Sequence, residues 1–340
     1  MSGPNVGILI KKVYNIGKIK IEKMITRPTV FILGAGASYG FGYPLGKNLV
    51  EIILKNFDPD NTKNSIELFK GLGFSEEEIA DFRKELKFSV SPSIDTFLEP
   101  RKEDERYLGK LAIANALIPF ENEEPLFYDD SWYSILFNKI NSSFENFDKN
   151  KVSFITFNYD RSLEFFLLTT LKNRYQKTEQ ECAAKLKNIP IVHLYGKLAL
   201  LPWEKTNPFD YTREYNPKIT PHFLRKSSTS LKIIYDKVDV PNDIDFKKAK
   251  LLINGARKIY FLGFGYHTEN LERLRIKLLT SSATGITSTA TTPTVSRIIE
   301  GTSFKLPQNL KESVPKIYKI RFPNHDWDIN EFFEQKIRLD

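Results

Sequence analysis

The sequence predicts an α/β fold of the Rossmann-like, doubly wound type, with a parallel sheet, helices on both faces and an inserted helical module. Two observations lead to this class. An unbroken apolar run, Thr29–Leu33, leads into the glycine-rich stretch 34–38 (Gly-Ala-Gly-Ala-Ser), and similar apolar runs recur later, each ending in glycine or polar residues. Continuous apolar runs are typical of buried parallel strands, and helical periodicity between them indicates strands that alternate with helices.

The glycine-rich stretch 34–38 is the first candidate site. Its two glycines allow a tight turn and a close approach of a ligand to the backbone, and a following helix would point free N–H groups at an anion. An amphipathic helical pattern begins near Pro44, with one apolar side made of Leu45, Leu49, Ile52, Ile53 and Phe57. The stretch is therefore either a pyrophosphate cradle or a plain tight turn.

Residues 58–150 show helical rather than strand periodicity, and we interpret them as a helical module inserted into the nucleotide-binding fold. Ser75 with Glu78 matches a capping box at the start of one of its helices. Between two of the helices lies the segment 93–99 (Ser-Ile-Asp-Thr-Phe-Leu-Glu). Its Asp95 is a candidate either for the site or for a helix N-cap.

Strand signals resume after the module, at 152–157, 189–194 and 258–262. Helical patterns lie between these runs, which supports the doubly wound sheet. Residues 199–242 carry proline and aromatic residues without a clear period, and we interpret them as an excursion rather than a domain. The Ser/Thr-rich stretch 281–294 predicts a loop.

Four predicted strands end in residues that can do chemistry. These ends are the stretches 34–38, 158–160 (Asn-Tyr-Asp), 193–196 (His-Leu-Tyr-Gly) and 263–265 (Gly-Phe-Gly). Each has an ordinary explanation as a helix cap, a satisfied histidine or a turn. In an open α/β sheet, however, ligands bind beyond the carboxyl ends of the strands. Together the four ends would bring a phosphate cradle, an amide, a carboxylate and an imidazole to one edge.

Composition restricts the class of protein. A chain of 340 residues with 41% hydrophobic and 13% aromatic residues can bury a large core. The single cysteine, Cys182, excludes an internal disulfide and a cysteine-rich zinc site. The sequence contains no apolar run long enough to span a membrane. The lysine-rich stretch 1–27 lacks the apolar core of a secretory signal, so we expect a flexible leader, or residues upstream of the native start, on a cytoplasmic protein.

The net charge of +8 suits nucleic acid, a polyphosphate ligand or an acidic partner. Basic residues are spread along the chain, without a long Lys/Arg block or a recognisable nucleic-acid motif. A solvated basic surface is the favoured interpretation. We therefore expect any contact with nucleic acid to be indirect.

The four strand ends resemble the sirtuin-like NAD-consuming family, in its bacterial antiphage-defence branch. The stretch 34–38 is similar to the family's glycine-rich NAD loop, and 156–160 (Thr-Phe-Asn-Tyr-Asp) is similar to its Thr-x-Asn-hydrophobic-Asp motif. The stretch 193–196 is similar to its His-x-x-Gly, and 263–265 stands where the second nucleotide loop is expected. The segment 93–97 is similar to a short motif in the helical module of defence-type members.

The chain departs from the protein-deacylating sirtuins. Those enzymes carry four zinc-binding cysteines where this chain has only Cys182, and Phe157 stands where they have glutamine. Their glycine-rich loop continues into Pro-Asp-Phe-Arg, whereas this one continues into 42–46 (Gly-Tyr-Pro-Leu-Gly). The resemblance, which covers residues 28 to about 275, therefore implies the zinc-free branch and no metal. It places one sirtuin-like NAD-binding catalytic domain over 28–340.

The resemblance implies an NAD+ hydrolase (NADase) that cleaves the nicotinamide–ribose bond of its substrate NAD and releases nicotinamide and ADP-ribose. Such an enzyme would be an antiphage-defence effector that depletes NAD+, the strategy called abortive infection. It would be held inactive as a homo-oligomer or by a partner such as a translocase-type ATPase encoded nearby. The alternatives are an ADP-ribosyltransferase or deacylase that uses the same pocket, or a non-catalytic subunit that binds NAD or ADP-ribose.

The resemblance also implies a role for each candidate residue. Asn158 would orient the ribose hydroxyls or the attacking water, although a helix N-cap is the alternative for this residue. Asp160 would contact the nicotinamide end, and His193 would be the general base towards a ribose hydroxyl or water. The nucleotide would be held by Gly34, Ala35, Gly36, Ser38, Asp160, Gly263 and Gly265.

Overall fold

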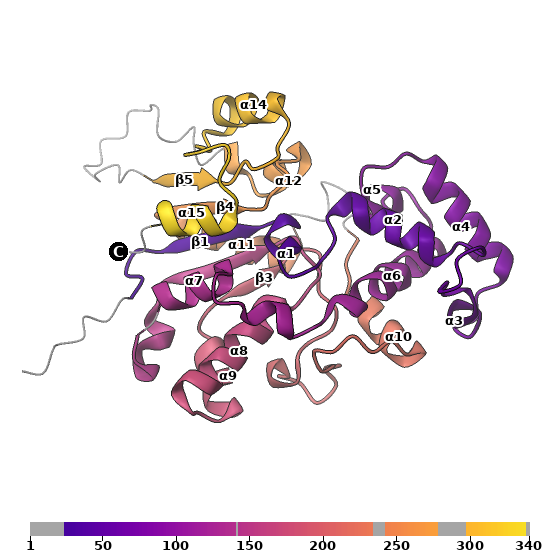
Figure 1. The fold of residues 1–340 in the computed structure, drawn as a ribbon, viewed down its shortest axis with the longest axis horizontal. Helices are drawn as coiled ribbons and strands as arrows, with labels where there is room; N and C mark the ends of the chain where they lie inside the picture. Colours follow the sequence, from indigo (N-terminus) through magenta and orange to yellow (C-terminus); the bar gives the residue numbers. More distant parts are fainter. Residues whose placement is uncertain (1–23, 141, 234–241, 278–296, 338–340) are drawn as a thin grey trace, which may run out of the picture.

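Five parallel strands form the centre of the computed structural model, which describes residues 24–140, 142–233, 242–277 and 297–337 (Figure 1). Most of the expected leader and the Ser/Thr-rich stretch 281–294 lie outside these residues. The strands are β1 (Thr29–Leu33), β2 (Val152–Thr156), β3 (Ile191–His193), β4 (Lys258–Leu262) and β5 (Ile298–Gly301). Their order in the sheet is β3-β2-β1-β4-β5, so the chain winds outward from β1 in both directions. The predicted doubly wound α/β fold is confirmed.

The strand register brings the carboxyl ends of four strands to one level. Leu33 at the end of β1 pairs with Thr156 of β2 and with Leu262 of β4, and Thr156 pairs in turn with His193 of β3. Every residue of β1, β2 and β4 is buried, as expected for continuous apolar runs between two layers of helices. The loops that follow these strands therefore start side by side.

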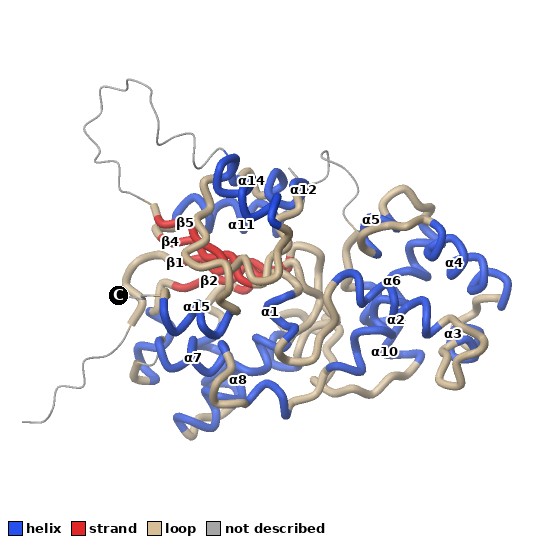
Figure 2. The backbone as a smooth tube through the Cα atoms, turned by 45° about the horizontal axis from the view of Figure 1, so that its top comes forward, coloured by secondary structure: helices blue, strands red, loops and turns tan. Residues whose placement is uncertain are grey.

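Helices cover both faces of the sheet (Figures 1 and 2). Side chains alternate along β1, so that Phe31 and Leu33 join one core and Val30 and Ile32 join the other. The first core is shared with α7 (Trp132–Lys139), α8 (Ser162–Tyr175), α9 (Glu179–Leu186) and α15 (Ile329–Gln335). The second is shared with α11 (Ile244–Gly255), α12 (Thr268–Arg273) and α14 (Gln308–Tyr318).

The inserted helical module lies beside the sheet (Figures 1 and 2). It consists of α2 (Gly46–Asn56), α3 (Ile66–Lys70), α4 (Glu76–Phe88), α5 (Ile94–Leu98), α6 (Glu103–Leu117) and α10 (Pro221–Thr229). Helix α10 comes from the excursion 199–242 and packs against α6. Helix α7 falls within the expected insertion 58–150, yet it packs against α8 and α15 on the sheet. The short helices are α1 (Gly36–Tyr39), η1 (Ile118–Phe120), η2 (Glu124–Phe127), η3 (Phe144–Lys149) and η4 (Pro202–Glu204).

The folded part of the chain begins before β1. Ile25 falls within the expected leader, yet it is buried, and its backbone N–H donates to Asn150 Oδ1 at 2.8 Å. The carbonyl of Ile25 accepts from the N–H of Lys151 at 2.9 Å. These contacts extend the pairing of β1 and β2 upstream of Pro28. Among the described residues no helix has the length and apolar character needed to cross a membrane.

Candidate active site

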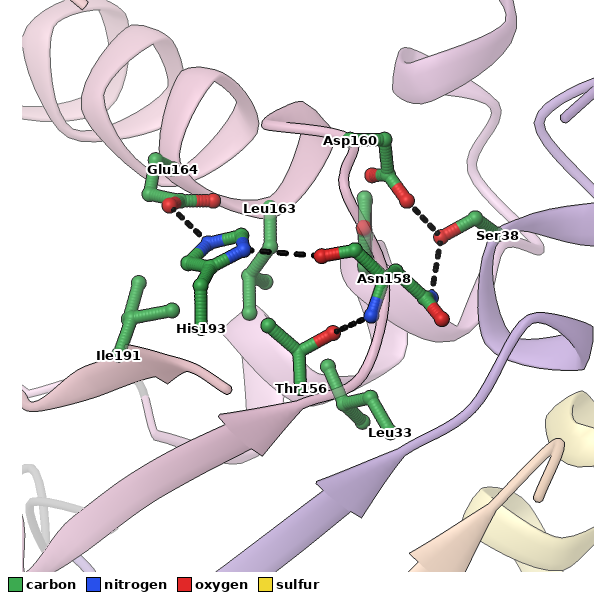
Figure 3. Close-up of a pocket in the computed structure, with 10 residues that line it drawn as sticks. Leu33, Ser38, Thr156, Asn158, Asp160, Leu163, Glu164, Ile191 and His193 are labelled. Atoms are coloured by element: carbon green, nitrogen blue, oxygen red, sulfur yellow. Dashed lines mark hydrogen bonds and ion pairs between the residues drawn. The ribbon is translucent and has the colours of Figure 1, made fainter. Parts of the chain in front are cut away.

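The carboxyl ends of β1, β2 and β3 meet at a small pocket (Figure 3). This is the edge at which doubly wound sheets bind ligands. Apolar contacts come from Leu33, Tyr133, Leu163 and Ile191. The side chains that supply polar atoms to the lining are Ser38, Thr156, Asn158, Asp160, Glu164 and His193.

Ser38 joins two of the predicted site residues. Its Oγ donates to Asp160 Oδ2 at 2.7 Å and accepts from Asn158 Nδ2 at 3.1 Å (Figure 3). The same amide nitrogen donates to the carbonyl of Gly34 at 3.0 Å, and the backbone N–H of Asn158 donates to Thr156 Oγ1 at 3.0 Å. Residues 122 and 120 positions apart are thus held in one network. The predicted convergence of the glycine-rich stretch with the stretch 158–160 is confirmed.

Asp160 is a buried carboxylate that neutral groups hold. Besides Ser38, the backbone N–H of Ser162 donates to Oδ1 at 3.2 Å, and the Ser162 hydroxyl donates to the same oxygen. The Ser162 hydroxyl lies 2.8 Å from that of Tyr133. Burial raises the pKa of Asp160, while the hydrogen bonds from Ser162 and Ser38 oppose this rise.

His193 lies between a backbone carbonyl and a buried carboxylate. Its Nδ1 is 2.9 Å from the carbonyl oxygen of Asn158, and its Nε2 is 2.7 Å from Glu164 Oε1 (Figure 3). Lys197 Nζ donates to the same Glu164 oxygen at 3.0 Å. The Glu164 side chain is only 2% exposed. Burial, the largest influence, pushes the pKa of Glu164 upward, but Lys197 and His193 together outweigh it and hold that pKa below its ordinary value.

Both ring nitrogens of His193 therefore face acceptors in this structure. A backbone carbonyl cannot donate, so Nδ1 carries a hydrogen in this arrangement. To act as a base, His193 must first exchange one of these two contacts for substrate or water. The Nδ1 contact is the one beside the catalytic candidates Asn158 and Asp160.

The glycines predicted to hold a nucleotide let two loops approach each other. A Cβ on Gly34 would lie 2.6 Å from the carbonyl oxygen of Gly263, and one on Gly36 would lie 2.8 Å from the Gly263 Cα. Gly263 itself has φ +56, and its added Cβ would lie 2.2 Å from the nitrogen of Ala37. The approach of the β1 and β4 loops thus explains these glycines without a ligand. Binding of phosphate by these residues and by Gly265, two positions further on, stays a prediction.

The amphipathic helix predicted to begin near Pro44 is confirmed as α2, but it does not start at the glycine-rich turn itself. The turn leads into α1, a single turn whose N-cap is Ala35, and the amphipathic helix begins only at Gly46. Gly42, in a left-handed conformation with φ +93, and Pro44 separate the two helices. The N–H groups of residues 36, 37 and 38 already donate to backbone carbonyls at 2.9, 2.9 and 3.2 Å.

The two N-cap alternatives can now be decided. Asp160 accepts the hydrogen bond from Ser162 N in the first turn of α8. The Asn158 amide donates instead to Ser38 and Gly34. Asn158 is therefore not the cap. The cap of α5 is Ser93, whose Oγ accepts from Thr96 N at 3.2 Å. The N-cap interpretation of Asp95 is therefore also wrong.

Sequence reasoning missed Glu164 and Lys197. Glu164 lies in α8 at helical spacing from the buried residues Leu168 and Leu171. A carboxylate at such a position is a signal of a paired, buried charge. Lys197 directly follows the stretch 193–196, but nothing in the sequence indicates its partner.

The described part of the chain holds no group of three or more His, Cys, Asp or Glu side chains arranged for a metal ion. A scan against protein-family models and a search of the curated proteins both return no match for this chain. Fold and pocket together define an α/β protein with a buried polar site at the carboxyl edge of a doubly wound sheet.

Proposed function

We propose that this chain is an NAD+ hydrolase that releases nicotinamide and ADP-ribose. One observation carries the proposal. Ser38, Asn158 and Asp160 are linked by hydrogen bonds, and His193 contacts the backbone of the same loop, all at the carboxyl edge of the sheet. These are the residue types and positions that the sirtuin-like resemblance implies for NAD cleavage.

The proposed reaction demands little covalent chemistry from the protein. The bond between the ribose C1′ and the nicotinamide nitrogen breaks, and its electron pair passes to the nicotinamide ring, which leaves neutral. A water oxygen bonds to C1′, and its proton passes to a base. The protein has to orient the ribose, position the water and accept the proton, and positioned general-base help is worth roughly 10²–10⁴ in rate.

His193 has the surroundings of a base that is oriented by a buried acid. Glu164 holds Nε2, and Lys197 keeps that carboxylate charged. Before the proposed step Nδ1 releases its hydrogen to solvent and exchanges the Asn158 carbonyl for water or a ribose hydroxyl. The ring keeps its proton on Nε2, so Nδ1 can accept the proton. Asn158 orients the ribose or the water through its amide, which both donates and accepts.

The size of the pocket limits how NAD can lie. Its cavity volume of about 10 Å³ is room for about one water molecule, far below the roughly 300–1,000 Å³ of sites that enclose whole ligands of drug size. We therefore assign the pocket to the attacking water, with the nicotinamide ribose at its mouth. The adenosine end would lie along the sheet edge towards the loop 263–265.

By the same resemblance we propose that the enzyme depletes NAD+ in antiphage defence, as a homo-oligomer or with a translocase-type ATPase partner. The basic net charge of +8 suits a polyphosphate substrate as well as an acidic partner. This part of the proposal rests on the resemblance alone.

Mass spectrometry of the full chain incubated with NAD and an acetylated peptide tests the activity. Free ADP-ribose and nicotinamide in equal amounts are expected, and His193→Ala should lower their rate by roughly 10²–10⁴ while NAD affinity changes only several-fold. ADP-ribosylated protein would assign transferase activity instead, and acetyl-ADP-ribose would assign deacylation. NAD that binds in calorimetry but stays intact would make the chain a binding subunit and overturn the hydrolase.

A further inference from the structure

Helix α5 of the helical module reaches the catalytic candidates through Asp95. Because Ser93 caps α5, the carboxylate of Asp95 is not required for the cap. Its Oδ1 instead accepts a hydrogen bond from the hydroxyl of Tyr159. This contact joins segments 64 positions apart and links the module to the loop after β2.

Tyr159 lies between Asn158 and Asp160 in the chain. The side chains on both sides of it turn to Ser38, whereas the Tyr159 side chain runs to α5 and is buried. The Tyr159 carbonyl accepts from the N–H of Leu198 at 3.0 Å. Planar peptide units join Tyr159 to both neighbours, so holding its hydroxyl and its carbonyl restricts where Asn158 and Asp160 point.

A second tyrosine makes a similar connection from the loop after β3. The hydroxyl of Tyr195, two residues after His193, accepts from Arg273 Nη1 at 2.6 Å and donates to Asn270 Oδ1 at 2.9 Å. Arg273 Nη2 lies 3.8 Å from the carboxylate of Glu99, one turn after Asp95. Both loops that supply catalytic candidates therefore have a tyrosine directed to the α5 region.

The Asp95–Tyr159 contact is the stronger of the two connections. Burial raises the pKa of Asp95, and the hydrogen bond from Tyr159 opposes that rise. Burial, followed by the charge of Asp95, raises the pKa of Tyr159 well above its ordinary value, so this hydroxyl remains a donor at neutral pH. Tyr159 is buried, so removing Asp95 would leave its hydroxyl without a partner away from water. The Arg273–Glu99 pair, at 3.8 Å, is longer than a hydrogen bond.

We propose that Asp95 is a positioning residue for the reaction proposed above: through Tyr159 it holds Asn158 and Asp160 in place and couples the helical module to the pocket. This inference rests on the proposed function for its effect on rate. The part of the inference that concerns structure, the position of the loop 158–160, does not depend on the proposed function. Displacements of about 1 Å at reacting groups can cost ~10²-fold in rate, which sets the size of the expected effect.

The kinetic test compares Asp95→Ala, Asp95→Asn and Tyr159→Phe in the full chain. Asp95→Ala and Tyr159→Phe should each lower kcat for NAD cleavage by about 10- to 100-fold, with little change in KM. The double variant should be no slower than the slower single variant, because both remove the same contact. Asp95→Asn keeps an acceptor oxygen and should retain most of the rate. Unchanged kcat in Asp95→Ala and Tyr159→Phe would overturn the proposal.

Ser93→Ala is the matched control, since it loosens the start of α5 without touching Tyr159. It should lower the melting temperature and leave kcat unchanged, which separates positioning from stability. Hydrogen exchange across 157–161 supplies a readout that does not depend on activity. We expect faster exchange in Asp95→Ala and Tyr159→Phe and wild-type exchange in Ser93→Ala. If the variants exchange as expected but the wild type leaves NAD intact, the coupling of α5 to the loop 158–160 is supported and the proposed hydrolase activity is contradicted. Unchanged hydrogen exchange in Asp95→Ala and Tyr159→Phe would contradict the coupling.

Discussion

Asp160 and Arg161 are consecutive residues whose side chains enter two different buried clusters. Asp160 faces the pocket, where neutral donors hold it and burial raises its pKa. Arg161 turns away from the pocket and is fully buried. Its Nε and Nη2 donate to the two carboxylate oxygens of Glu121 at 2.9 and 2.7 Å, and Arg213 contacts the same carboxylate. We call Arg161, Glu121 and Arg213 the arginine cluster.

The arginine cluster has the properties of a structural ion-pair network. All five N–H groups of Arg161 donate: two to Glu121, and the others to the carbonyls of Leu200, Arg213 and Glu214 at 3.3, 2.8 and 3.1 Å. The cluster joins the loop after β2 to the segments that follow η1 and η4. A charge whose donors are all occupied by the protein has none left for a ligand.

The pocket differs from the arginine cluster because the protein does not fully stabilise all of its polar groups. Asp160 is a carboxylate in surroundings that disfavour its charge, and His193 keeps its Nδ1 against an exchangeable carbonyl contact. Perturbed carboxylates in a cleft are candidates for function, whereas sealed ion pairs contribute to structure. Substitutions in the arginine cluster should therefore act on stability, whereas substitutions in the pocket should also act on chemistry.

Glu121→Gln should have the largest effect on stability. It leaves two buried guanidinium groups without their carboxylate, and breaking a buried ion pair by removing one partner costs about 3–5 kcal/mol. Urea denaturation measures the loss. Glu124→Gln is the matched control on the exposed surface, with an expected change within about 0.5 kcal/mol. Equal stability of the two variants would remove the structural role of the cluster.

Glu164→Gln should have an intermediate effect that depends on pH. Hydrogen bonds to charged groups contribute about 1.5–3 kcal/mol, and this variant weakens those from His193 and Lys197. The pKa of Glu164 is lowered on folding, so its contribution is present above the ordinary value of 4.5 and is lost as the pH falls through the folded-state pKa. Thermal melting at several pH values should show the variant converging on the wild type in acid. A difference in melting temperature between variant and wild type that stays constant or widens in acid would contradict the charged state of Glu164.

Asp160→Asn should have the smallest effect on stability. The pKa of Asp160 is raised on folding, so its ionised form carries a cost at neutral pH that disappears below the ordinary value of 3.8. Asparagine removes that charge and can still bond Ser162 and Ser38. At pH 7 the free energy of unfolding of the variant should equal that of the wild type or exceed it by up to about 1 kcal/mol. NAD turnover should fall. A strongly destabilised variant would place Asp160 with Arg161 as a structural residue.

The sequence allowed good predictions wherever the physics is local. The strands at β1, β2 and β4 are continuous apolar runs, and a buried parallel strand requires that pattern. Strand β5 was not predicted because Glu300 interrupts its short apolar run of four residues. In the structure Glu300 is a buried carboxylate bonded to Arg321. Helix α7 was assigned to the module because periodicity identifies an apolar face without identifying what covers it.

The site shows the same division. The meeting of Asn158, Asp160 and His193 at one edge could be predicted because they lie at or just after the ends of strands in a recognisable parallel sheet. The arginine cluster could not, since Glu121 and Arg213 lie 40 and 52 positions from Arg161. Nothing in a sequence with 50 basic and 42 acidic residues says which of them pair. The role of Glu164 was within reach, because a carboxylate stands there at helical spacing among the buried apolar residues of α8.

Asn158→Ala tests the central claim most directly when melting temperature and NAD loss are measured on the same preparation. The Asn158 amide bonds Ser38 and Gly34 at the rim of the pocket and does not cap α8. The account predicts that turnover falls by orders of magnitude while stability changes by no more than about 1 kcal/mol. A variant that melts lower but hydrolyses NAD at the wild-type rate would contradict it.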